Sequence, residues 1–126
     1  MRIEHLALWT HDLEALRDFY CCYFKASASP RYHNPAKQFT SYFLSFASGC
    51  RLELMHRPEL GNPSAEVHIG LAHFALSVGS EEAVDHMTEV LQQAGYPPID
   101  GPRHTGDGYY ESTFRDPDGN LIELTV

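Results

Sequence analysis

Hydrophobic and polar residues alternate along several short stretches of the chain, and two longer stretches repeat their apolar residues at helical spacing. Alternation sends successive side chains to opposite faces and predicts strands, whereas apolar residues three and four apart predict amphipathic helices. The predicted helices cover 11–24, with Thr10 as N-cap, and 80–94, with Ser80 as N-cap and Gly95 as C-terminal glycine. The predicted strands are 2–9, 26–32, 38–46, 50–56, 71–78, an irregular one ending near 104, 109–115 and 120–126.

The same order of elements, βαβββ, occurs in both halves of the chain. The halves are about 1–56 and 71–126, and the linker 57–70 between them contains prolines and glycines but no clear period. Halves of about 60 residues must share a core to be stable. The sequence therefore predicts an α+β fold and one domain, 1–126, in which two tandem βαβββ modules form a curved mixed sheet around a metal-binding cavity.

Four polar residues occupy matching positions in the two halves. His5 and Glu53 are 48 positions apart, and His73 and Glu123 are 50 apart. In each of their strands the leucines have the parity that faces a helix, and the His or Glu has the opposite parity. If the sheets curve toward each other, all four side chains point into one cavity.

Two carboxylates and two imidazoles in such a cavity would be costly to desolvate without a partner. A divalent cation neutralises both carboxylates and uses all four groups as ligands. Two nitrogen and two oxygen donors suit Ni, Zn, Fe, Co or Mn, and the sequence does not choose between them. A single His on a strand, or a Glu between two leucines, is ordinary. The prediction depends on the duplicated pair with matching spacing and parity.

The composition of the chain indicates which partners and which cellular compartment to expect. A net charge of −8 argues against binding nucleic acid or an anionic membrane surface. No apolar run approaches the roughly 20 residues that span a bilayer, and the first residues lack a signal-peptide pattern. Three cysteines, two of them adjacent, make a poor disulfide framework. The sequence therefore predicts a cytoplasmic protein that acts on a small molecule.

The chain resembles the vicinal oxygen chelate superfamily, which includes glyoxalases, bleomycin-resistance proteins and dioxygenases. The resemblance covers essentially all 126 residues. It is carried by the paired βαβββ order, by His5 after Ile-Glu, and by two runs, GLAHFALSV from Gly70 to Val78 and FRDPDGNLIEL from Phe114 to Leu124.

The His–Glu–His–Glu order is most similar to bacterial-type glyoxalase I, a lactoylglutathione lyase. The resemblance implies that His5, Glu53, His73 and Glu123 bind the metal, with Glu53 and Glu123 as candidate bases. It implies proton transfer between adjacent carbons of a 2-oxoaldehyde–thiol adduct, or a similar vicinal-oxygen substrate, through an enediolate. It also implies a homodimer, with the site either within one subunit or shared between two.

Two positions depart from the glyoxalase I pattern, which usually has an Arg four residues after the first His and an Asn soon after the first Glu. Trp9 and Arg57 stand near these positions. Substrate contacts are expected from Trp9, Arg57, Arg103 and Tyr109, and the identity of the thiol stays open.

Three other functions share the module. A thiol transferase of the fosfomycin-resistance type uses three ligands, so Glu53 argues against it. A metal-free binding protein of the bleomycin-resistance type would not need four intact ligand positions. Ring-cleaving dioxygenases use two histidines and one carboxylate in a longer chain.

Overall fold

The computed structural model describes residues 4–61, 73–106 and 108–126. The chain divides into two compact units, Met1–Ser64 and Ala65–Val126. Residues 2–3 and 71–72 of the predicted strands, and 62–70 of the predicted linker, lie outside the described residues. No helix among the described residues is long and apolar enough to cross a membrane.

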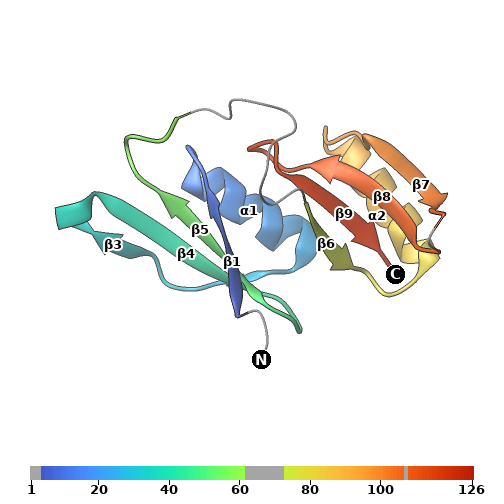
Figure 1. Ribbon diagram of the computed structural model, residues 1–126, viewed down its shortest axis with the longest axis horizontal. Helices are drawn as coiled ribbons and strands as arrows, with labels where there is room; N and C mark the ends of the chain where they lie inside the picture. Colours follow the sequence, from blue (N-terminus) through green and yellow to red (C-terminus); the bar gives the residue numbers. More distant parts are fainter. Residues whose placement is uncertain (1–3, 62–72, 107) are drawn as a thin grey trace. The chain divides into compact units, whose positions relative to one another are not determined.

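The first unit is one mixed sheet with a helix on one face (Figure 1). Its sheet order is β1-β5-β4-β2, with β3 also paired to β4; β1 and β5 are parallel and the other pairs antiparallel. The elements in chain order are β1 (His5–Trp9), α1 (Leu13–Phe24), β2 (Ser27–Ala28), β3 (Tyr32–Asn34), the 3₁₀ helix η1 (Pro35–Lys37), β4 (Phe39–Ser45) and β5 (Arg51–His56).

The second unit repeats this plan with a four-stranded sheet. Its sheet order is β6-β9-β8-β7, with β6 and β9 parallel. The elements are β6 (Phe74–Ser77), α2 (Glu81–Gln93), β7 (Asp100–His104), β8 (Tyr110–Arg115) and β9 (Leu121–Thr125). Two helices and two mixed sheets in this order confirm the predicted α+β fold of βαβββ modules.

The predicted parity of the ligand strands is confirmed by burial. On β5, Leu52 and Leu54 are buried while Glu53 between them is partly exposed. On β9, Ile122 and Leu124 are buried on either side of the partly exposed Glu123. These buried side chains form the cores under α1 and α2, which contact β5 and β9 respectively. Both carboxylates therefore lie on the sheet face away from the helix of their own unit.

The start of the first helix differs from the sequence prediction. Asp12, rather than Thr10, is the N-cap, because its carboxylate accepts the Ala15 N–H at 2.9 Å. The Thr10 hydroxyl instead accepts the Asp12 N–H at 3.0 Å and organises the preceding turn. The helix accordingly begins at Leu13. At the second helix the predicted Ser80 cap is confirmed, because the Ser80 hydroxyl accepts the Ala83 N–H at 3.2 Å.

Two strands also differ in detail from the prediction. The segment predicted as one strand, 26–32, forms the two short strands β2 and β3, and β3 continues to Asn34. The irregularity expected before 104 is a register shift in the β7–β8 pair. Gly101 in this stretch has φ +82°, and a Cβ there would lie 2.4 Å from the Glu111 carbonyl oxygen. Glycine is required at this position for both reasons.

Candidate metal centre

The two His–Glu pairs are built by the same strand register. In the parallel β1–β5 pair, Ala7 lies opposite Glu53, and His5 is two residues before Ala7. In the parallel β6–β9 pair, Ala75 lies opposite Glu123. His73 is likewise two residues before that alanine. We call His5 with Glu53 the first half-site and His73 with Glu123 the second half-site. In both, the small alanine leaves room between the imidazole and the carboxylate.

Each His reaches toward the Glu of its own unit. The His5 Nε2 lies 3.9 Å from a Glu53 carboxylate oxygen, and the His73 Nε2 lies 3.3 Å from one of Glu123. The glutamates are 16% and 19% exposed, and the histidines 39% and 43%. The carboxylates are thus the more enclosed members of both pairs.

These distances are compatible with donors to a common metal ion. Nitrogen and oxygen ligands at about 2.1 Å from a metal, at ordinary coordination angles, lie about 3.0–3.4 Å apart. The second half-site already has this spacing, and the first must close by less than about 1 Å. The described parts of the chain contain no cluster of three or more His, Cys, Asp or Glu side chains suited to a metal ion. Each half-site therefore offers two donors.

Glu4 orients the imidazole of His5, a role that no sequence pattern indicated. A Glu4 carboxylate oxygen lies 2.6 Å from the His5 Nδ1. The other Glu4 oxygen accepts bonds from the Arg51 guanidinium at 2.9 and 2.5 Å. The hydrogen bond with His5, and then those from Arg51, hold the pKa of Glu4 below its ordinary value. Because an ionised carboxylate only accepts, Nδ1 carries the proton and Nε2 is free to bind a metal.

An aromatic ring lies beside the first half-site. Phe43 lies opposite Glu53 in the β4–β5 pair. The His5 ring packs edge-on against Phe43 with centroids 5.4 Å apart, and the Arg51 guanidinium lies 4.2 Å from its centroid. His5 is therefore held by both a hydrogen bond and a ring contact.

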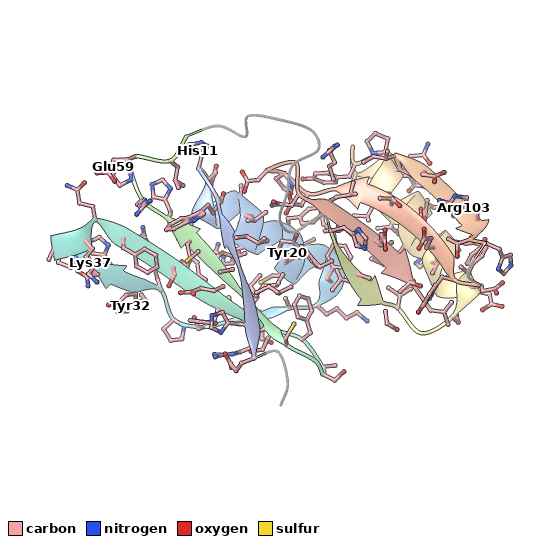
Figure 2. The ribbon with its side chains drawn as sticks, in the orientation of Figure 1. His11, Tyr20, Tyr32, Lys37, Glu59 and Arg103 are labelled. Atoms are coloured by element: carbon pink, nitrogen blue, oxygen red, sulfur yellow. The ribbon has the colours of Figure 1, made fainter. Side chains whose placement is uncertain are left out.

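The second half-site has different neighbours. Thr113, instead of a phenylalanine, lies opposite Glu123. Arg103 on β7 pairs with Asp100 at 2.5 Å and approaches Glu111 at 3.7 Å (Figure 2 labels Arg103). The hydrogen bond with Asp100 is the main cause of a raised Arg103 pKa. The arginine predicted to contact substrate is thus already paired with carboxylates.

The remaining predicted substrate residues fall into the two units. In the first unit the structure brings Trp9 and Arg57 together, with the guanidinium 4.8 Å from the centre of the indole ring. In the second unit Tyr109 precedes β8 and is exposed, and its N–H bonds to the Thr105 hydroxyl. The sequence pattern did not indicate the contact between Trp9 and Arg57.

Comparisons with known proteins agree with this architecture. Residues 2–124 match the family described as Glyoxalase/Bleomycin resistance protein/Dioxygenase superfamily. No curated protein matches the sequence.

Similar solved structures include a glyoxalase family protein from Enterococcus faecalis, with TM-score 0.82 and 24% identity, over 99% of this chain and 97% of that one. A possible glyoxalase from Bacillus cereus has TM-score 0.73 and 27% identity, over 100% and 99%. The trypanothione-dependent glyoxalase I of Leishmania major has TM-score 0.80 and 21% identity, over 99% and 86%. At such identities these likenesses concern the fold.

Proposed function

Because the chain belongs to the Glyoxalase/Bleomycin resistance protein/Dioxygenase superfamily, we propose that it is a metal-dependent lyase or isomerase of glyoxalase type. Its ligands are His5, Glu53, His73 and Glu123, two from each unit. The observation that carries the proposal is the repeated register, in which each His lies two residues before an alanine that faces the Glu. Two half-sites of the same register, with His–Glu distances of 3.9 and 3.3 Å, support the proposal that one ion uses four such donors, either of one subunit or of two.

The proposed reaction moves one proton between neighbouring carbons. A divalent ion held by His5, Glu53, His73 and Glu123 would supply Lewis-acid polarisation of the substrate when bound. Glu53 or Glu123 accepts the proton from the carbon that bears the thiol sulfur and returns it to the adjacent carbonyl carbon. A hemithioacetal of a 2-oxoaldehyde then becomes a 2-hydroxy thioester without gain or loss of atoms. The low exposure of Glu53 and Glu123, 16% and 19%, is consistent with slow exchange of this proton with water.

The test is metal analysis followed by a substrate screen. Purified protein is expected to hold about one divalent ion for each pair of half-sites. It should convert methylglyoxal or phenylglyoxal, with one of several thiols, to the thioester, and lose this activity on chelation. Protein that binds no divalent ion would contradict the proposal and favour a metal-free binding protein. Sedimentation of the same samples tests the homodimer, which stays a prediction.

Glu4→Ala is expected to weaken zinc binding about 10- to 100-fold, because removal of a residue that hydrogen-bonds to a metal-binding histidine usually has an effect of this size. Without Glu4, no described carboxylate holds the His5 Nδ1 proton and keeps Nε2 directed at Glu53. Calorimetric titration with zinc measures the loss.

Two matched variants complete this experiment. Glu4→Gln keeps an oxygen acceptor for the Nδ1 proton and should retain most of the affinity. Glu59→Ala removes the same charge from an exposed residue of the same unit and should leave the affinity unchanged. Equal affinities for Glu4→Ala and Glu59→Ala would show that Glu4 does not orient the ligand.

A further inference from the structure

A row of residues one step from the first half-site carries exposed aromatic rings. Trp9, Met55, Ser41 and Tyr32 lie opposite one another across β1, β5, β4 and β3. Met55 is two residues after Glu53, so this row has the same face as the carboxylate and lies about 7 Å along the strands. The row is therefore within reach of a small molecule bound at Glu53.

Three rings of this region form a continuous cluster. Phe39 packs against Trp9 and against Tyr32, with centroids 6.2 Å apart in both contacts. Trp9 remains 43% exposed and Tyr32 54% (Figure 2 labels Tyr32, at the β3 end of the first unit). We call Trp9, Phe39 and Tyr32 the aromatic cluster. It offers flat apolar surface on the face that carries the candidate metal ligands.

Arg57 adds a positive charge to the aromatic cluster. Its guanidinium lies over the Trp9 ring, and no carboxylate among the described residues lies within ion-pair distance of it. The other two arginines near the half-sites differ, because Arg51 is bound to Glu4 and Arg103 to Asp100. Arg57 is thus an exposed cation without a carboxylate partner among the described residues, in a chain of net charge −8. A guanidinium in this setting is suited to bind a carboxylate.

We propose that the aromatic cluster and Arg57 bind the distal part of the substrate, an aromatic group that carries a carboxylate. The ring packs on Trp9 and Phe39, and the carboxylate accepts hydrogen bonds from the guanidinium. The identification of this ligand as the substrate rests on the proposed function. The binding itself requires neither the metal nor the reaction.

The test uses metal-free protein and the fluorescence of Trp9, which is the only tryptophan in the chain. The probes are 4-phenylbutyrate and its uncharged amide, 4-phenylbutyramide. We expect a saturable change in Trp9 emission with the carboxylate and at least about 10-fold weaker binding of the amide, as for the loss of a charged hydrogen bond. Arg57→Gln should weaken binding of the carboxylate by a similar factor and leave that of the amide unchanged.

Two further variants separate charge from ring contacts. Arg31→Gln makes the same charge change at another exposed arginine of the first unit and should bind both probes like the wild type. Phe39→Leu keeps the Trp9 signal and should weaken both probes, because the ring surface is reduced. Thermal melting of each variant verifies that it is folded.

Either of two results would overturn the proposal. One is equal binding of the carboxylate and the amide, with no effect of Arg57→Gln in folded protein. The other is a shift of Trp9 emission on dilution without any probe, which would mean that a second copy of the chain covers the aromatic cluster. These measurements use metal-free protein. If the protein proved to bind no metal or to lack lyase activity, binding of the probes would still be expected.

Discussion

Replacing His73 with Ala is expected to lower the affinity for a divalent ion more than 10- to 100-fold. That range is the usual effect of removing a residue that only hydrogen-bonds to a metal ligand. His73 supplies the nitrogen of the second half-site, with its Nε2 3.3 Å from the Glu123 carboxylate. Its loss removes a ligand outright. His5→Ala should have a comparable effect, although His5 belongs to the other unit. Calorimetric titration of metal-free protein with zinc measures both.

The comparison of the two variants tests whether one ion uses both half-sites. If a single ion uses all four ligands, each His→Ala variant lowers the same affinity and the stoichiometry stays unchanged. Two independent ions would instead give two binding events, with one lost in each variant. His86→Ala changes an exposed histidine on α2, and His11→Ala one in the first unit; neither should alter binding. An unaffected affinity in His5→Ala would remove the first half-site from the metal centre.

Strand parity is the part of the site that could be predicted from the sequence. Alternation of Leu52 and Leu54 with Glu53, and of Ile122 and Leu124 with Glu123, correctly indicated that both carboxylates lie on the face away from the helices. The histidines are on the same face because the parallel pairs align Ala7 and Ala75 with these glutamates. Register of this kind follows from which residues must be buried, and the sequence contains that information.

Contacts made by side chains across strands could not be predicted in this way. Glu4 and Arg51 are 47 positions apart, and their ion pair depends on the β1–β5 register rather than on a local pattern. The contact between Arg57 and Trp9 joins the ends of two strands for the same reason. The helix start was also missed, because Thr10 and Asp12 are both good capping residues and only the turn geometry selects Asp12.

The two half-sites have the same strand register, but different residues surround their histidines and glutamates. This difference suggests that Glu53 and Glu123 have different roles. In the first, Glu4 and Phe43 fix His5, and Glu53 lies 3.9 Å from the imidazole. In the second, Thr113 instead of a phenylalanine lies opposite Glu123, and the carboxylate lies closer to its His, at 3.3 Å. We infer that Glu123 is the more firmly held ligand and Glu53 the carboxylate that moves the proton.

Glu53→Gln is accordingly expected to lower turnover about 10²- to 10⁴-fold, the usual contribution of a positioned base, while the protein keeps its metal. The amide retains an oxygen donor and nearly the same shape but cannot accept the proton. Glu123→Gln should instead lose metal affinity first, with turnover recovering as zinc is raised. Steady-state kinetics over a range of zinc concentrations, with metal content measured on the same samples, separates the two effects.

Glu59→Gln is the matched control for this pair, since it removes one exposed carboxylate of the first unit and should leave both turnover and metal content unchanged. The opposite pattern, with Glu123→Gln metal-loaded but inactive and Glu53→Gln active, would exchange the two roles and leave the lyase hypothesis intact. Full turnover in metal-loaded Glu53→Gln would exclude Glu53 as the essential base. Full turnover in both metal-loaded variants would show that neither glutamate is essential as the base on its own.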